Sequence, residues 1–501
     1  MSSNSAELPG RAGARTPTLA LSALFVRAHW LRLIAISAVV LAPCYWHRQI
    51  EAGDLGSHVY NAWLAQLIEH GQAPGLAIVP IWTNILFDHM LSGLANAFGL
   101  HIAEKIAVAL AVLIFFWGAF ALAAAATRRA PWFVVPLIAM VAYGWTFEMG
   151  FFNYYIALGM SFFGLALFWR GNRLERVLAV APVPLMVLAH PLGLVWLLGA
   201  ALYVGLAESI PRRWHSLLFF AAAGGILLLR FYLYGHFVAD AEEDPLYLFS
   251  GADQFLLMGT KYKATQLAAL IFIPVAILWD VIRRRRDSGV WESYSLALQL
   301  YILVELGVLL LPDGVRFEGA PAALALLTER ITSISAVLLC CLLGAMSPRR
   351  WHMAGLSAIA LVFFWFLYQD TTVLNRMEGQ VERLVTALPP NQRVLGTIKP
   401  PPGSRVLIQH MLDRACIGHC FSFGNYEPTT GMFRVRGLPG NGYNMIDGNS
   451  TAAMEDGSYE VQRQDLPAYQ IYQCSPSGTD LCIRPLEEGE DNDRVGVHPT
   501  P

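Results

Sequence analysis

The sequence predicts a polytopic α-helical membrane protein with about eleven transmembrane helices and a C-terminal domain on the non-cytoplasmic side. Three observations support this prediction. The chain is 55% hydrophobic and only 14% charged, it contains a series of long apolar segments, and its arginines gather in alternate gaps between those segments. Soluble globular chains carry about 25% charged residues. Lipid is therefore expected to be the solvent for most of this chain.

The apolar segments set the predicted number of spans, since a helix needs about 20 mostly apolar residues to cross a bilayer. The first segment lacks the small-residue cleavage site of a signal peptide and is predicted to be retained. Two neighbouring segments are short and meet at His190-Pro191, which is either a tight turn at the outer surface or a kink within a re-entrant pair. The eleven predicted spans are residues 30–47, 104–126, 131–148, 151–170, 177–190, 192–207, 215–235, 263–282, 293–311, 328–346 and 353–369.

Arginine sets the predicted orientation, because short loops rich in Arg and Lys stay in the cytoplasm. The arginines in alternate gaps are Arg11, Arg15 and Arg27; Arg128 and Arg129; Arg170, Arg173 and Arg176; Arg212 and Arg213; Arg283, Arg284, Arg285 and Arg286; and Arg349 and Arg350. The N-terminus is therefore predicted inside and the C-terminus outside. The predicted parts are a cytoplasmic tail at residues 1–29, a membrane domain at 30–370 and an outer soluble domain at 371–501.

The soluble domain is predicted to be α+β or mostly β. An amphipathic stretch runs from Arg376 to Leu388, and Pro-rich steps follow it. The short runs RVLGTI and RVLIQH then alternate with turns rich in Gly, Asn and Pro, as strands do.

The seven cysteines divide between the two environments. Cys44, Cys340 and Cys341 lie in or beside predicted spans, where a free thiol is usually a small apolar filler. An even number in an oxidising compartment favours two disulfides. A four-thiolate zinc site, with His419 nearby, is the alternative, although CIGHC lacks the paired CxxC spacing. The four cysteines of the soluble domain are Cys416, Cys420, Cys474 and Cys482.

The first outer loop, residues 48–103, is the most informative segment. It contains EAGDLGSHVYNAWLAQLIEHGQAPG, in which apolar residues recur at helical spacing from Ser57 onward. This helix is too short and too polar to span and is predicted to lie along the membrane surface. A second apolar stretch, residues 81–98, is interrupted by Asp88 and His89.

Glu51 and Asp54 stand directly before this helix, and His58 follows four residues after Asp54. The arrangement resembles the GT-C superfamily of membrane glycosyltransferases, in topology and in this loop. The resemblance implies a polyprenyl-phosphate-linked sugar donor and an essential acidic residue in the first outer loop. The family commonly has an acidic pair here, whereas this chain has E-A-G-D. Glu51 and Asp54 are both candidates for the catalytic carboxylate, with Asp54 preferred.

Transfer from a lipid phosphate to a hydroxyl needs a base for the hydroxyl and positive charge on the leaving phosphate. Asp54 is the predicted base, assisted by His58 or by a divalent metal such as Mg²⁺ or Mn²⁺ held with Asp88 or His89. Simpler structural roles compete, because a loop carboxylate ahead of a helix is often only a cap. Predicted phosphate-binding cations at the outer ends of spans are Arg230, Lys261, Lys263, Arg316 and Arg330.

Two other features belong to the same predicted outer face. Glu148 lies at an outer turn amid aromatic residues and is predicted to face the same cavity as Asp54. Arg316 and Arg330 have the alternative of pairing with Glu318 and Glu329 as contacts between helices.

The functional prediction is a glycosyltransferase of a bacterial inner membrane with its C-terminal domain in the periplasm. It moves a sugar from a polyprenyl-phosphate carrier, among membrane lipids, to a lipid, glycan or protein acceptor not identified by the sequence. The soluble domain is predicted to be a lid or acceptor-binding module. A transporter or an assembly factor for envelope polysaccharide is the alternative. A net charge of −2 and the lack of a phosphate loop argue against nucleic acid.

Overall fold

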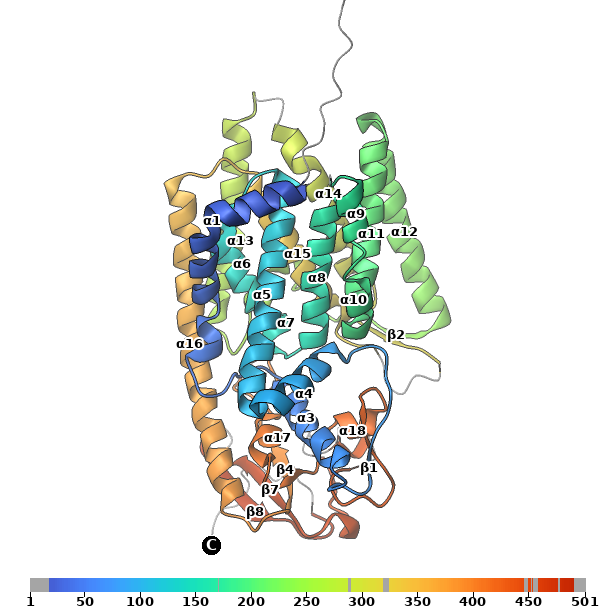
Figure 1. Cartoon of the computed structure of the whole chain (residues 1–501), viewed down its shortest axis with the longest axis vertical. Helices are drawn as coiled ribbons and strands as arrows, with labels where there is room; N and C mark the ends of the chain where they lie inside the picture. The colour runs from blue at the N-terminus through green and yellow to red at the C-terminus, as the bar shows by residue number, and fades with distance from the viewer. Residues whose placement is uncertain are drawn as a thin grey trace, which may run out of the picture.

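The computed structural model describes residues 18–169, 171–286, 290–318, 324–445, 449–451, 453, 458–475 and 478–490. The predicted cytoplasmic arginines Arg11, Arg15 and Arg170 lie outside these ranges. The long helices run along the long axis of the molecule, and a group of shorter helices and strands covers one end of the bundle (Figure 1).

Helices make up most of the described chain. The α-helices are α1 (Thr18–Val40), α2 (Ala42–Tyr45), α3 (Leu55–Glu69), α4 (Leu86–Phe98), α5 (Leu100–Thr127), α6 (Val135–Ala142), α7 (Trp145–Glu148), α8 (Phe152–Phe168), α9 (Arg173–Leu178), α10 (Val183–Ala189), α11 (Pro191–Ser209), α12 (His215–His236), α13 (Tyr262–Arg283), α14 (Val290–Leu310), α15 (Leu327–Gly344), α16 (Arg350–Thr386), α17 (Met411–Cys416) and α18 (Glu427–Thr430). Short 3₁₀ turns are η1 (Trp132–Val134), η2 (Arg212–Trp214), η3 (Phe249–Phe255) and η4 (Arg463–Asp465).

The strands form three small sheets. They are β1 (Leu76–Ile78), β2 (Val238–Asp240), β3 (Gly314–Arg316), β4 (Arg393–Thr397), β5 (Phe421–Ser422), β6 (Val435–Gly437), β7 (Ala468–Gln473) and β8 (Leu481–Pro485). The largest sheet has the order β5-β4-β7-β8, in which β4 is parallel to β5 and β7, and β8 is antiparallel to β7. The pairs β1-β6 and β2-β3 are antiparallel.

Within the described residues, six helices are long and apolar enough to cross a membrane. They are Leu100–Thr127, Pro191–Ser209, Arg212–His236, Tyr262–Arg283, Leu327–Gly344 and Arg350–Thr386, and the shorter apolar helices are Trp132–Glu148, Phe152–Phe168 and Tyr294–Leu310. These helices confirm the prediction of a helical membrane protein. Not all of the eleven predicted spans are long helices among the described residues. Predicted span 30–47 is interrupted after α1, and 177–190 is divided between α9 and α10, where Pro182 lacks the amide hydrogen that a continuous helix needs.

Helix α16 joins the helical bundle to the C-terminal region. Its 37 residues correspond to about 55 Å of helix, whereas the hydrocarbon core of a bilayer is about 30 Å thick. The amphipathic stretch predicted at 376–388 is thus largely the continuation of the last span. The predicted domain boundary at residue 371 falls inside this helix.

The C-terminal region is α+β, as predicted. RVLGTI contains β4, whereas RVLIQH forms no strand and leads into α17. Both predicted disulfides are confirmed, with sulfur–sulfur distances of 2.02 Å for Cys416–Cys420 and 1.99 Å for Cys474–Cys482. The four-thiolate zinc alternative is wrong, because the sulfurs are taken up in two separate pairs.

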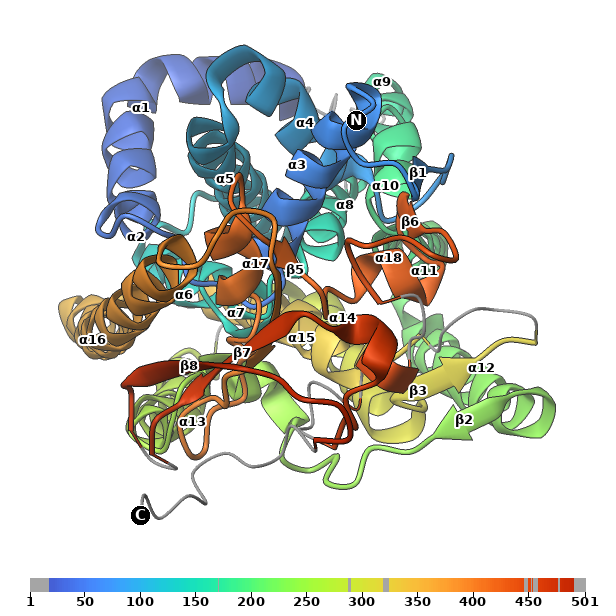
Figure 2. The same ribbon diagram turned by 90° about the horizontal axis from the view of Figure 1, so that it is seen from below.

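The first outer loop and the C-terminal region are packed on each other. Strand β1 of the loop pairs with β6, so that Leu76 faces Gly437 and Ile78 faces Val435. Viewed along the bundle from this end, α17 lies beside α3, and β6 lies beside β1 (Figure 2). The soluble end is therefore built from two segments far apart in the chain.

Candidate functional site

The EAGD segment lies at the junction of three parts of the chain. The backbone amides of Gly53 and Asp54 donate to the carbonyl oxygens of Glu148 and Met149, at 2.7 and 3.0 Å. A Cβ on Gly53 would lie 2.5 Å from the Met149 carbonyl oxygen, and a Cβ on Gly56 would lie 2.0 Å from that of His410. Only glycine permits these approaches. The backbone of this loop is therefore fixed from both sides.

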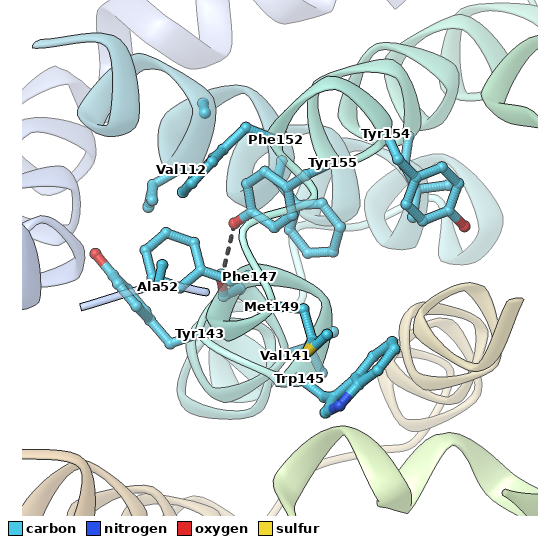
Figure 3. Close-up of a cluster of buried hydrophobic side chains, with 14 of the residues drawn as sticks. Ala52, Val112, Val141, Tyr143, Trp145, Phe147, Met149, Phe152, Tyr154 and Tyr155 are labelled. Carbon is cyan, nitrogen blue, oxygen red and sulfur yellow. Dashed lines mark hydrogen bonds between the residues drawn. The ribbon is translucent and has the colours of Figure 1, made fainter. Parts of the chain in front are cut away.

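A buried aromatic cluster supports this junction from the membrane side. Figure 3 shows Ala52 beside Phe147 and Tyr143, with Tyr155 donating its hydroxyl to the Ala142 carbonyl oxygen at 2.8 Å. The Phe147 and Phe152 rings meet edge to face, with 5.4 Å between their centroids. Close-packed rings of this kind resist displacement. They hold the segment that carries Asp54 at a fixed depth.

Glu51 belongs to a buried ionic cluster around Arg414. The Arg414 guanidinium donates to both Glu378 carboxylate oxygens at 2.7 and 2.6 Å, and to Glu104 Oε1 at 2.8 Å. Glu51 Oε2 lies 3.6 Å from the same guanidinium, and Asn375 donates to Glu51 Oε1 at 2.8 Å. One cation therefore serves three carboxylates from the first loop, α5 and α16.

The cluster has opposite effects on its members. Burial, together with the nearby Glu378 carboxylate, raises the pKa of Glu51 well above its usual value, although Arg414 opposes this. Burial tends to lower the pKa of Arg414, but Glu104, Glu378 and Glu51 outweigh it, and the pKa is raised. The raised pKa favours the neutral form of Glu51, which makes it a weaker candidate for the base.

Asp54 has a different environment. Its carboxylate remains partly exposed, and its Oδ1 lies 3.7 Å from Nε2 of the buried His410. The other ring nitrogen of His410, Nδ1, lies 2.9 Å from Asp413 Oδ2. A hydrogen on Nδ1 can be donated to Asp413 Oδ2, and in that tautomer Nε2, on the side of Asp54, is the accepting ring nitrogen. The structure thus brings a carboxylate, an imidazole and a second carboxylate into one row.

Asp413 is held in place by donors of its own domain. The Ser422 hydroxyl donates to Oδ1, and the Asn425 amide donates to Oδ2 at 2.7 Å. The side chain is buried. With both oxygens engaged, Asp413 fixes the His410 ring relative to the domain, and the domain fixes it relative to Asp54.

A second cluster contains His58, Asp88 and Glu427. His58 Nδ1 lies 3.0 Å from Asp88 Oδ1 and 3.5 Å from Glu427 Oε1. Burial acts to lower the pKa of His58, but contact with Asp88 prevails and the pKa is raised to about 9. Burial raises the pKa of Glu427 to about 8, against the effect of His58. Asp88 was predicted as a metal ligand, and the structure brings it to His58.

Hydrogen bonds connect the group of Asp54, His410 and Asp413 to the cluster of His58, Asp88 and Glu427. Ser57 donates to Glu427 Oε1 at 3.1 Å, and the Asn425 amide donates to the Ser57 hydroxyl at 2.9 Å as well as to Asp413. The Asn61 amide donates to Asn425 Oδ1 at 3.0 Å. All of these side chains are buried. The side chains around Asp54 and those around His58 therefore belong to one polar network.

Arg330 is the predicted phosphate-binding cation that lies closest to this network. Its Nη1 lies 3.3 Å from His190 Nε2, and its guanidinium stacks 4.2 Å from the Phe151 ring centroid. It interacts electrostatically with Asp54 and Glu329, yet no described carboxylate lies within ion-pairing distance of it. A cation at the edge of the hydrocarbon without a bound counter-ion is costly and marks a functional candidate.

The remaining predicted cations have other surroundings. Lys261 pairs with Asp370 at 2.6 Å. Arg230 donates to the Leu310 carbonyl oxygen on α14, Arg316 is exposed on β3, and Lys263 is exposed on α13. The structure does not bring these four side chains into contact with Asp54.

Glu148 and His89, which were predicted to contribute side chains to the site, have other surroundings. Glu148 is buried, and its Oε2 lacks a hydrogen-bond partner among the described residues. It contributes to the site through its carbonyl oxygen, which receives the Gly53 amide. His89 is exposed, while its neighbour Asp88 points into the buried cluster.

Sequence reasoning missed the contribution of the C-terminal domain. His410, Asp413 and Arg414 are spaced along one short helix and its cap in QHMLDRAC, and Glu427 lies on α18. The helical spacing of these three polar residues was a usable signal. It was obscured because the preceding RVLIQH was interpreted as a strand.

A small pocket lies where the EAGD loop meets residues 406–414. Glu51, Gly53, Gly56, His410 and Arg414 contribute to its lining, and its volume of about 10 Å³ admits about one water molecule. A sugar would require the two segments to separate. Comparison with known protein families, with curated proteins and with solved structures found no match to this chain.

Replacing Arg414 by Gln is expected to destabilise the attachment of the C-terminal domain by roughly 3–5 kcal/mol, because Glu104 and Glu378 lose their buried counter-ion. A lower thermal midpoint and faster tryptic release of the fragment after α16 will report it. Arg376→Gln, on the exposed face of α16, is the matched control. Equal midpoints for the two variants would show that the cluster does not hold the domain.

The raised pKa of Glu51 predicts a pH effect on stability. Because the pKa of Glu51 is raised in the folded protein, its contribution to the free energy of unfolding is complete below the unfolded-state pKa, near 4.5. This contribution is lost as the pH rises toward the folded-state pKa. The stability of Glu51→Gln relative to wild type should therefore increase between pH 5 and pH 8, by up to about 1.4 kcal/mol per pH unit. Thermal midpoints of both proteins across this range test it. A difference independent of pH would contradict a raised pKa of Glu51.

Proposed function

We propose that this chain is a GT-C-like glycosyltransferase that moves a sugar from a polyprenyl-phosphate carrier to an acceptor hydroxyl at the outer membrane surface. The observation that carries the proposal is the row Asp54, His410 and Asp413, located where the first outer loop meets the C-terminal domain. It places a partly exposed carboxylate beside a fixed imidazole at the predicted catalytic loop. Such an arrangement suits removal of a proton from a hydroxyl.

The chemistry assigns a role to each group. Asp54 takes the proton of the acceptor hydroxyl while the hydroxyl oxygen bonds to the anomeric carbon of the sugar. The bond from that carbon to the carrier phosphate breaks at the same time. The phosphate leaves with the bonding electrons, beside the charge of Arg330. His410 can accept the proton from Asp54 at Nε2, and Asp413 stabilises the resulting imidazolium, as the carboxylate does in hydrolase triads.

The topological part of the proposal places the N-terminus inside and the site outside a bacterial inner membrane. Arg129 and Arg284 donate to carbonyl oxygens at the C-terminal end of α15, those of Gly344 and Ala345, so basic segments meet at the end of the bundle opposite the EAGD loop. Arginine-rich ends favour the cytoplasm. The disulfides at the opposite end favour an oxidising compartment such as the periplasm.

Asp54→Asn is expected to lower kcat by roughly 10²–10⁴, because the amide cannot accept the proton. The assay measures sugar release from a panel of polyprenyl-phosphate donors by purified protein. Asp480→Asn, which changes an exposed carboxylate of the C-terminal region, should retain wild-type activity, and His410→Gln should lose less activity than Asp54→Asn. Undiminished transfer by Asp54→Asn would refute the base, and no transfer by wild type with any donor would favour the transporter or assembly factor.

Arg330→Gln is expected to lower kcat/KM for the lipid donor by roughly 10–150-fold, since a charge-assisted hydrogen bond to phosphate contributes about 1.5–3 kcal/mol. Arg330→Lys should restore part of this loss because it keeps the charge without the planar fork. Arg316→Gln, on the exposed strand β3, is the control. The assignment of Arg330 fails if the two glutamine variants have the same kcat/KM.

A further inference from the structure

The cluster of His58, Asp88 and Glu427 has the composition of a metal site. Three ligand atoms, His58 Nδ1 and one oxygen from each carboxylate, lie within 4.8 Å of one another. Their side chains are 6%, 5% and 2% exposed. The three residues come from α3, α4 and α18, so the fold has converged them from segments that are distant in the chain.

The two separations from His58 Nδ1 are close to those expected around a small tetrahedral ion. Bonds of 2.0–2.1 Å from zinc to nitrogen and oxygen place neighbouring ligand atoms about 3.3–3.4 Å apart. The observed separations from His58 Nδ1 are 3.0 Å to Asp88 and 3.5 Å to Glu427. Small movements of the side chains would complete the geometry.

A hydrogen bond alone explains only part of the cluster. The Nδ1 hydrogen can be directed to Asp88 at 3.0 Å, but Glu427 Oε1 at 3.5 Å is then too far for a good bond to the same nitrogen. Both carboxylates are also oriented by outer donors, as metal ligands usually are. Asn153 donates to the free oxygen of Asp88 at 3.3 Å, and Ser57 donates to Glu427 Oε1 at 3.1 Å.

We infer that His58, Asp88 and Glu427 bind one transition-metal dication, for which Zn²⁺ is the best match, and that this ion fastens the C-terminal domain to the first outer loop. A mixed imidazole and carboxylate set favours such ions over Mg²⁺. By contrast, the group Glu242, Asp313 and Glu329 offers only carboxylates. The ion would connect α18 to α3 and α4 across the same junction that Arg414 spans. The inference does not require the proposed transfer reaction.

The test measures zinc in full-length protein purified in detergent, stripped with EDTA and dialysed against ZnCl₂. Wild type is expected to retain one Zn²⁺ per chain by mass spectrometry. His58→Gln, Asp88→Asn and Glu427→Gln keep side-chain size and should each weaken zinc binding at least about tenfold. His89→Gln, which alters an exposed histidine beside Asp88, is the matched control and should bind as wild type does.

A second readout tests the fastening role without any sugar donor. Zn²⁺ should raise the thermal midpoint and slow proteolysis within residues 427–436 in wild type and His89→Gln, but not in Glu427→Gln. Gel filtration identifies any of the three cluster variants that fails to fold, and the remaining cluster variants then test zinc binding. No zinc in wild type, or equal zinc affinity in wild type and every folded cluster variant, would overturn the inference. Zinc binding without the change in protection would overturn its fastening role.

Discussion

The contact of Arg414 with the carboxyl groups of Glu378, Glu104 and Glu51 is the constraint on which the position of the C-terminal region depends. Its guanidinium engages Glu378 on both oxygens and Glu104 on one, with Glu51 close by. Removing such charges from water is costly, so the contact is favourable only while all partners stay in place. Because the partners come from the first loop, α5, α16 and α17, it sets the position of the C-terminal domain on the bundle.

This constraint also separates the roles of the two loop carboxylates. Glu51 is buried beside Glu378 and Arg414, and burial raises its pKa, while Asp54 remains partly exposed and faces His410. The glycines of EAGDLG make the separation possible, because Gly53 and Gly56 allow backbone contacts on opposite sides of Asp54. Proximity in sequence therefore gives two carboxylates with different chemical states. One connects domains, and the other is available for chemistry.

The C-terminal domain consequently contributes to the site itself as well as covering it. His410 and Asp413 approach Asp54, while Glu427 approaches His58. Asn425 bonds to both groups through Ser57 and Asp413. A network with this connectivity couples the position of the domain to the orientation of the polar side chains that it contacts.

The sequence alone predicted the helical membrane character, a C-terminal region that is α+β or mostly β, and two disulfides, because hydropathy and cysteine number are local properties. Tertiary structure decided how the cysteines pair, and that Asp88 rather than His89 meets His58. It also decided that Lys261 pairs with Asp370, whereas Arg330 has no carboxylate partner among the described residues. It also brought His410, more than 350 positions along the chain, to Asp54. Such meetings depend on long-range packing, which no local pattern encodes.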